Sequence, residues 1–310
     1  MGSIGDSERA AKLHAATPVF SLLLAATLWG IFWFPLRWLE QFGLSGLWQT
    51  FFIYTGTLWV VIVILWRQRQ NFFRELGLAP WPLLFMALAS GVCNTTFILA
   101  MLEGEVMRVL LLFYLSPLWA TLIGWLFLKE KLHVLSIGVL IVAIGGAGVM
   151  LWHPGMGHPW PADKGDWLAL VAGINFAILN SLVRFTDRVS IPVKTSVAWF
   201  GAILVSGTLI MFTGIDFPEV SFQVAGYAWL IGALMMVIMT FSVVYGVTHM
   251  PVHRSAVILL FELVAGAVSS QWLTEEVILP KEWIGGTLIV IAAWLSARSQ
   301  LQNPDKDLVI

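Results

Sequence analysis

Long, uninterrupted apolar stretches are the feature that most limits how this chain can fold. We distinguish ten, most of them about twenty residues long, which is enough for an α-helix to cross a hydrocarbon core of about 30 Å. Backbone groups in lipid must bond within the protein, and continuous runs do so as helices, whereas a β-barrel would need alternating segments. The sequence therefore predicts an all-α membrane protein with spans at 19–39, 47–66, 81–102, 106–128, 134–152, 167–185, 193–212, 224–248, 252–273 and 283–297.

Composition agrees with this fold class. Hydrophobic residues make up 59% of the chain and charged residues 11%, far below the roughly 25% charge of a soluble domain. The single cysteine, Cys93, excludes an intramolecular disulfide and a cysteine-based metal site. We expect the lipid bilayer and a small-molecule substrate as partners, with no nucleic acid and no cofactor.

The two halves of the chain repeat each other. Segment 107–113 aligns with segment 253–259, which places Arg108 opposite Arg254, 146 residues later. The same alignment places Glu130 opposite Glu276 and, with one residue of slippage, Arg37 opposite Arg184. An internal repeat in a membrane protein is typical of transporters whose halves enclose a site near the midplane. With five spans in each half, the second repeat must be inverted relative to the first.

The distribution of basic residues predicts the orientation. If the N-terminus is cytoplasmic, only four of the 17 Lys and Arg residues fall on the opposite side, namely Arg37, Arg108, Lys164 and Lys281. Because basic residues favour the cytoplasmic side, we expect an inner (plasma) membrane protein with both termini cytoplasmic. The expected organisation is a tail at 1–18, a five-helix repeat at 19–152, a periplasmic linker at 153–166, an inverted repeat at 167–298 and a tail at 299–310.

Polar residues at membrane depth are costly and therefore informative. Glu262 is the only acid well inside a predicted span, and it lies about 12 Å beyond Arg254 along a helix. One interpretation is a structural carboxyl that stabilises helix packing, either protonated or hydrogen-bonded to a hydroxyl. The other is a functional carboxyl at the repeat interface that titrates a proton or faces the substrate. Asn94, Asn180 and Thr240 lie in short groups of polar residues within other spans. These groups are explained either by hydrogen bonds between helices or by a shared cavity, and both explanations remain open.

Aromatic residues suggest a wall for that cavity. Many tryptophans sit at span ends, as membrane-interface residues do, but Trp29 and Trp33 lie inside the first span on one face. A lipid-facing stripe and a surface that stacks on a flat ligand remain alternatives. The predicted substrate-binding residues are Trp29, Trp33, Asn94, Tyr114, Phe176, Asn180, Thr240, Tyr245 and Glu262.

Pro117 in the middle of the fourth span predicts a kink, either static or a hinge for gating. In the ninth span Leu263 stands opposite Pro117, so bending there would need Gly266. Small-residue patches at 145–148 and 285–286 predict close helix contacts and leave room for a homo-oligomer. His249 and His253 have a metal-like spacing, but Pro251 between them and the lack of an acidic ligand argue against a metal site.

The passages Leu115-Ser116-Pro117 to Leu128-Lys129-Glu130 and Phe261-Glu262 to Glu276 resemble the EamA repeat of the drug/metabolite transporter superfamily. The resemblance covers nearly the whole chain and implies ten helices as two inverted five-helix repeats. Within the superfamily, this tryptophan-rich chain is most similar to bacterial exporters of aromatic amino acids of the YddG type. The chain departs from the family pattern at Leu263, where proline often follows the glutamate, so only Pro117 carries over as a hinge.

The sequence contains no zincin, serine-hydrolase or Walker motif, so we expect neither an enzyme nor an ATP-driven pump. Our leading interpretation is a secondary exporter of amino acids, chiefly aromatic and other hydrophobic ones, that works by alternating access through a midplane cavity. A same-fold exporter of other metabolites or drugs, such as quaternary amines or nucleosides, is the alternative. A non-transporting scaffold is disfavoured, because a scaffold does not need an inverted repeat.

Overall fold

The computed structural model describes residues 3–67, 72–127, 134–152, 160–184, 186, 188–249, 255 and 258–299, and within them every regular element is a helix. Glu130, His253 and Arg254, which the sequence singled out, lie outside these residues. The elements are α1 (Ser3–Ile31), α2 (Trp33–Gln41), α3 (Gly46–Arg67), α4 (Phe72–Leu76), α5 (Pro80–Glu103), α6 (Val106–Phe113), α7 (Ser116–Phe127), α8 (Val134–Leu151), α9 (Lys164–Arg184), α10 (Ile191–Thr213), α11 (Phe222–Leu230), the π-helical η1 (Ile231–Met236), α12 (Val237–Thr248), α14 (Phe261–Leu273) and α15 (Pro280–Ser299).

Seven helical runs in the described residues are long and apolar enough to cross a membrane, and a shorter apolar helix covers Ile137–Leu151. The protein is therefore a multi-pass membrane protein. α14, with 13 residues, and α15 are helical at the positions of the last two predicted spans but fall outside these seven. The seven runs are Thr17–Gln41, Gly46–Arg67, Pro80–Glu103, Val106–Leu126, Lys164–Val183, Ile191–Thr213 and Phe222–Thr248.

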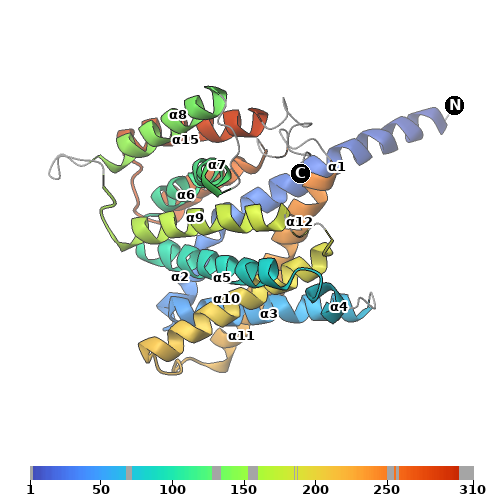
Figure 1. Ribbon diagram of the computed structural model, residues 1–310, viewed down its shortest axis with the longest axis vertical. Helices are drawn as coiled ribbons and strands as arrows, with labels where there is room; N and C mark the ends of the chain where they lie inside the picture. The colour runs from blue at the N-terminus through green and yellow to red at the C-terminus, as the bar shows by residue number, and fades with distance from the viewer. Residues whose placement is uncertain are drawn as a thin grey trace.

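The long helices lie side by side in a bundle (Figure 1). α8 and α15 pack together at one edge, α3 and α11 lie at the other, and α5 packs between α9 and α10. Close approach of α8 and α15 depends on glycine, because a Cβ on Gly146 would lie 2.7 Å from the Gly285 carbonyl oxygen and a Cβ on Gly285 2.5 Å from that of Gly146. The small-residue patches therefore make the close helix contact that the sequence predicted.

The first span is two helices rather than one. α1 ends at Ile31 and α2 begins at Trp33, with Phe32 in a turn whose amide bonds to the Trp29 carbonyl at 3.2 Å. Pro35 in the first turn of α2 explains the break, because proline has no amide hydrogen to donate to the carbonyl four residues earlier.

The fourth span is also interrupted, which corrects the expected mid-helix kink at Pro117. α6 ends at Phe113, Tyr114 and Leu115 form a turn, and α7 begins at Ser116. Pro117 is thus the second residue of α7, a position where a missing amide donor costs nothing. Pro117 thus lies at the start of α7, just after a break between two helices, instead of bending one continuous helix.

A break also precedes α14, although no proline follows it. Leu260 is in a turn, and the Leu263 amide bonds to the Leu260 carbonyl at 3.1 Å. Leu260 is 146 residues from Tyr114, so the two interruptions occupy aligned positions of the repeat. Gly266, the expected bending point, lies inside the continuous α14, where a Cβ would come within 2.4 Å of Leu110 Cδ1. Its contribution in this structure is close packing against α6.

Candidate functional site

Tyr114 and Glu262 connect the two helix interruptions. The Tyr114 hydroxyl lies 2.6 Å from Glu262 Oε2 and 3.3 Å from the Leu259 carbonyl oxygen. Tyr114 directly follows the last residue of α6, and Glu262 is in the first turn of α14, where the positive end of the helix dipole favours an acidic side chain. The contact joins residues 148 positions apart and brings together the aligned break points of the two halves.

Glu262 has no basic partner among the described residues. Its side chain is buried, with 8% of the residue exposed, and none of the ion pairs found in this part of the chain includes it. Burying a carboxylate away from water is expensive unless a proton, a cation or several hydrogen bonds offset the charge. The Tyr114 hydroxyl supplies one hydrogen bond, so Glu262 has the capacity to take up a proton or a positively charged group of a ligand.

An aromatic row leads to this pair from α1, α5 and α9. Ring centroids are 6.4 Å apart for Trp29 and Phe97, 4.9 Å for Phe97 and Phe113, and 5.1 Å for Phe113 and Phe176. Phe113 also lies 6.2 Å from the ring of its neighbour, Tyr114. All these pairs are edge-on or tilted, which is the geometry that aromatic quadrupoles favour. The row therefore consists of Trp29, Phe97, Phe113 and Phe176, and it ends beside Tyr114 and Glu262.

Two members of the aromatic row were missed by sequence reasoning. Phe113 precedes the predicted Tyr114, and Phe97 lies three positions after Asn94, on a neighbouring part of the same helix face. A search for aromatic residues within one helical turn of each predicted site residue would have found both.

Trp33 does not share the surroundings of Trp29. It is 2% exposed, its indole Nε1 donates to Ser269 Oγ at 3.0 Å, and the Arg37 guanidinium lies 5.2 Å from its ring centroid. These contacts hold α2 against α14 in the protein core. The two tryptophans expected to form one wall are thus divided between the aromatic row and the packing of the bundle.

The remaining predicted site residues lie outside this constellation. Asn94 accepts a hydrogen bond from the Tyr54 hydroxyl of α3 at 2.6 Å and donates one to the Ser90 carbonyl at 2.8 Å, which is the helix-bridging alternative. Asn180 is exposed on α9, and Thr240 is half-buried in α12. Tyr245 is 39% exposed, and its ring lies 4.2 Å from that of His249. Of the nine predicted residues, the row and the carboxyl contact bring together Trp29, Tyr114, Phe176 and Glu262.

Arg37 holds several helix ends together at one end of the bundle. Its guanidinium pairs with Glu276 at 2.6 Å and donates to the carbonyl oxygens of Met101 at 3.1 Å and Gly104 at 2.6 Å. The other carboxylate oxygen of Glu276 accepts the Val106 amide, at the start of α6, at 2.9 Å. One ion pair thus ties α2 to the α5–α6 connection and to the segment between α14 and α15.

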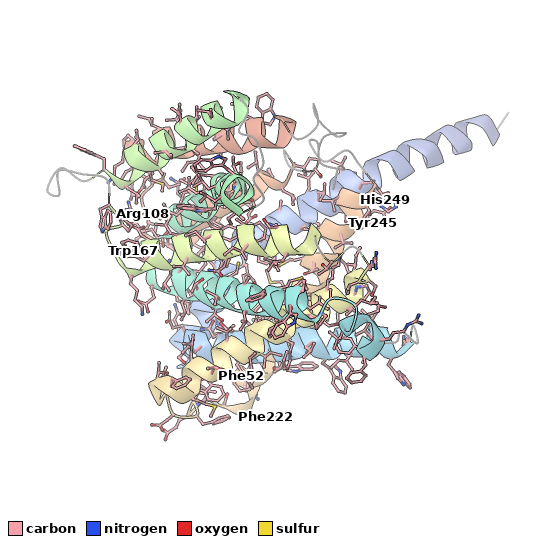
Figure 2. All side chains as sticks on the ribbon, in the orientation of Figure 1. Phe52, Arg108, Trp167, Phe222, Tyr245 and His249 are labelled. Carbon is pink, nitrogen blue, oxygen red and sulfur yellow. The ribbon has the colours of Figure 1, made fainter. Side chains whose placement is uncertain are left out.

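A second ion pair, more deeply buried, lies at the same end. Arg108 donates from Nε to Asp166 Oδ1 at 2.6 Å and from Nη2 to Oδ2 at 2.7 Å, while its Nη1 is 3.6 Å from Glu282. We call Arg37, Arg108, Asp166, Glu276 and Glu282 the charge cluster. Figure 2 shows Arg108 near the start of α9, beside Trp167, whereas Tyr245 and His249 lie toward the opposite end. The cluster joins α2, α6, α9 and α15 and so closes one end of the bundle.

Glu105 borders the charge cluster on the solvent side. Partial burial raises the pKa of its carboxyl, and the carboxylates of Glu282 and Glu276 raise it further, while Arg108 opposes them. Acidic groups thus outweigh basic ones around this residue. Sequence reasoning identified Arg37, Arg108 and Glu276 as repeat markers but did not predict that they meet in space.

A metal site is not apparent in the described part of the chain, where no three His, Cys, Asp or Glu side chains are placed to hold an ion. The predicted absence of a metal site at His249 and His253 is not tested, because His253 lies outside the described residues.

Comparison with known proteins identifies the family. The model of the EamA-like transporter family matches residues 16–152 and 163–298. The chain is 24% identical over 216 residues to the uncharacterized transporter PA0485 of Pseudomonas aeruginosa, an alignment that covers 68% of this chain and 69% of that protein. A solved crystal structure with 15% identity aligns over 93% of this chain and 98% of the other with a TM-score of 0.56, which shows a shared fold alone. The two matched segments span most of the chain, which is therefore a membrane transporter and belongs to the EamA-like transporter family of the drug/metabolite transporter superfamily.

Proposed function

We propose that this transporter is a secondary exporter of amino acids, aromatic and other hydrophobic ones above all, that works by alternating access. The observation that carries the proposal is the aromatic row ending at the Tyr114–Glu262 contact. A buried carboxyl that has no basic partner among the described residues suits the ammonium group of an amino acid, and the adjoining rings of Phe113 and Phe176 suit an apolar or aromatic side chain. The two ends of such a substrate thus have separate places in one site.

The proposed architecture is ten transmembrane helices in two inverted repeats, 19–152 and 167–298, between cytoplasmic tails and with a periplasmic linker at 153–166. Two observations support it. The family model matches two successive segments, and the breaks at Tyr114 and Leu260 occupy aligned positions. In Figure 1 the first turns of α1 and helix α4 lie at the same end, and Figure 2 shows Arg108 of the charge cluster toward the opposite end, which fits a cytoplasmic N-terminus.

In this proposal the charge cluster closes the periplasmic end while the site is reached from the cytoplasm. Opening toward the periplasm requires separation of Arg37 from Glu276 and of Arg108 from Asp166, which tie together helices of both halves. The interruptions at Tyr114 and Leu260 are suitable bending points, because each lies between two helical segments and not inside a continuous helix.

The test is transport by the purified chain in proteoliposomes, with labelled phenylalanine, tryptophan and leucine, in the presence and absence of a pH gradient. We expect uptake that Glu262→Gln abolishes and that His249→Gln leaves intact, because the contacts of His249 within the described residues are with Tyr245 and Thr248. If a pH gradient drives transport by the wild type, the same gradient must fail to drive the Glu262→Gln variant. Gradient-driven transport that Glu262→Gln does not change would reassign Glu262 to helix packing.

A second candidate substrate class is favoured by the same carboxyl. Because the described residues provide no basic partner for Glu262, an organic cation such as a quaternary amine would also be attracted there. Competition separates the two classes. If quaternary amines inhibit amino acid uptake only weakly and are not themselves transported, the amino acid assignment stands.

A further inference from the structure

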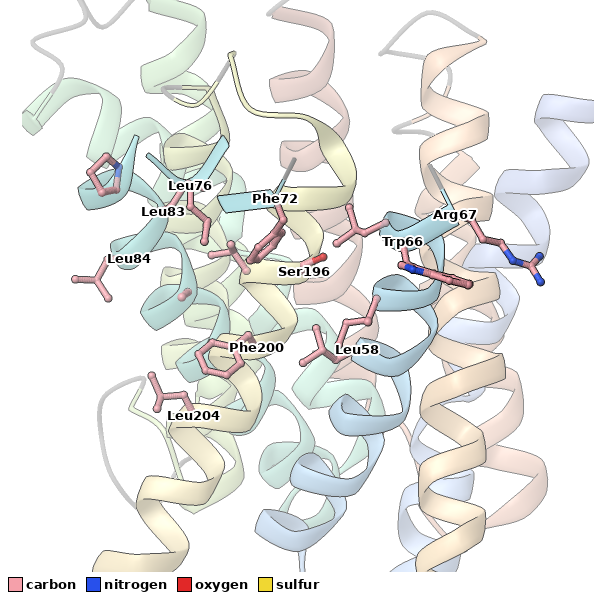
Figure 3. A pocket seen from close by; sticks show the side chains of 15 residues that line it. Leu58, Trp66, Arg67, Phe72, Leu76, Leu83, Leu84, Ser196, Phe200 and Leu204 are labelled. Carbon is pink, nitrogen blue, oxygen red and sulfur yellow. The ribbon is translucent and has the colours of Figure 1, made fainter. Parts of the chain in front are cut away.

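A large cavity in the described part of the chain lies away from the Tyr114–Glu262 site. It has a volume of about 1280 Å³ and lies between α3, α5 and α10, with α4 beside it. That volume exceeds the roughly 300–1,000 Å³ typical of small-molecule pockets. Figure 3 shows the apolar side chains of Leu83, Leu84, Phe200 and Leu58 around this groove, with Trp66 and Arg67 at the end of α3.

The groove runs lengthwise along the helices from one membrane interface. On α3 its lining extends from Arg67 to Leu58, nine positions or about 14 Å, and on α10 from Ser196 to Leu204, about 12 Å. Half of a hydrocarbon core is about 15 Å thick. The groove therefore has the length of one leaflet, begins where α3 ends, and stops near the level of the midplane.

The lining of the groove matches the chemistry of a lipid: its deep part is apolar, like an acyl chain, and its outer end is charged, like a headgroup. Among the described residues, Arg67 is the one charged residue that lines it, and none of the lining residues is Asp or Glu. Arg67 is exposed at the end of α3 next to Trp66, which is 79% exposed, and this pairing is typical of the headgroup region. Phe200 and Leu204 are 52% and 42% exposed, so their side chains are available to an acyl chain.

We infer that this groove is a binding site for one anionic phospholipid of the leaflet on the Arg67 side, with an acyl chain along α3 and α10 and the phosphate near Arg67. Basic residues between transmembrane helices commonly recognise anionic headgroups. The site is separate from the proposed transport site, because none of the residues of the aromatic row or the charge cluster lines it. It is independent of the proposed substrate.

Native mass spectrometry of the purified full chain tests the acyl-chain contact. The chain is incubated with phosphatidylglycerol or with phosphatidylethanolamine carrying the same acyl chains. We expect one retained phosphatidylglycerol, and we expect Leu204→Trp to displace it by filling the deep end of the groove. Leu209→Trp is the matched control, because Leu209 is a similarly exposed residue of α10 that does not line the groove.

The headgroup contact is tested with Arg67→Gln against Arg74→Gln, since Arg74 is exposed on α4 but does not line the groove. Loss of one basic residue near the headgroup is worth about 1 kcal/mol, so Arg67→Gln is expected to weaken phosphatidylglycerol binding roughly fivefold. Arg74→Gln should change it less, and neither should change phosphatidylethanolamine binding.

Four results would overturn the inference: equal retention of the two lipids, equal effects of Leu204→Trp and Leu209→Trp, a dimer of the chain that occupies the groove in place of lipid, or displacement of the lipid by a transported amino acid. Failure of the transport proposal is recognised separately, because Glu262→Gln should abolish uptake while leaving lipid retention unchanged.

Discussion

The buried ion pair of Arg108 allows a quantitative test of the charge cluster. Asp166 receives two short hydrogen bonds from the guanidinium, and Glu282 lies 3.6 Å from Nη1, so one cation faces two carboxylates. Arg108→Gln removes the only positive charge among the three and leaves two buried acids together. Breaking a buried pair in this way costs about 3–5 kcal/mol. Asp166→Asn instead leaves Arg108 with Glu282 as counter-charge and loses charged hydrogen bonds, which costs about 1.5–3 kcal/mol.

The assay is equilibrium unfolding in mixed micelles, with increasing dodecyl sulfate and helix content followed by circular dichroism. Arg108→Gln should be the more destabilising change, and Arg108→Gln combined with Asp166→Asn should recover part of its loss, because the double variant holds one buried carboxylate fewer. Lys164→Gln is the control, since its pair with Glu103 is exposed and is worth about 0–1 kcal/mol. If Asp166→Asn is as costly as Arg108→Gln, or if Lys164→Gln matches either, the assignment of a charge imbalance at Arg108 is wrong.

Three further predictions concern single side chains. Tyr114→Phe keeps the ring but removes the hydroxyl partner of Glu262, so uptake below saturation should fall about tenfold or more, while Tyr245→Phe should have little effect. Pro117→Ala restores the amide donor at the start of α7, and we expect it to slow turnover with little loss of substrate affinity. The uptake rate and substrate binding measure the two effects. An unchanged rate would contradict a role for the α6–α7 break in gating. For Glu105, the raised pKa means that its contribution to stability is present below the ordinary carboxyl pKa and is lost as pH rises through the raised value. Glu105→Gln should therefore be more stable than the wild type at pH 7, and unfolding midpoints should show this difference shrinking as pH falls.

The sequence predicts the helices well because their signal is local. Twenty apolar residues in a row identify a membrane helix without knowledge of its neighbours, and the repeat shows that the two halves are related. The break at Phe32 could have been predicted from Pro35, whose missing amide ends the preceding helix. The break at Leu260 could not, because no proline follows it and the Tyr114 hydroxyl that bonds the Leu259 carbonyl comes from the other half of the chain.

The candidate site was predicted less completely for the same reason. The partner of a polar residue at depth depends on which helix faces it, and the sequence does not give that. Asn94 bonds to Tyr54 of α3, a helix that supplied none of the predicted site residues, and Trp33 bonds to Ser269 of α14. Glu262 was expected to bond a hydroxyl or to face a substrate, and the structure places the Tyr114 hydroxyl 2.6 Å from its Oε2.

Tyr114 links the protonation of Glu262 to the hydrogen bonding of the Leu259 carbonyl just before α14. A hydroxyl group has one hydrogen, yet Tyr114 Oη lies within reach of two acceptors, Glu262 Oε2 and the Leu259 carbonyl. If Glu262 is ionised, it competes for that hydrogen as the stronger acceptor, and the carbonyl goes without it. If Glu262 is protonated, its own hydroxyl can donate to Tyr114, which frees the tyrosine hydrogen for Leu259. Arrival of a single proton thereby reverses the direction of the Tyr114–Glu262 hydrogen bond and frees the tyrosine hydrogen for Leu259, so the backbone just before α14 gains a donor that it lacks in the charged state.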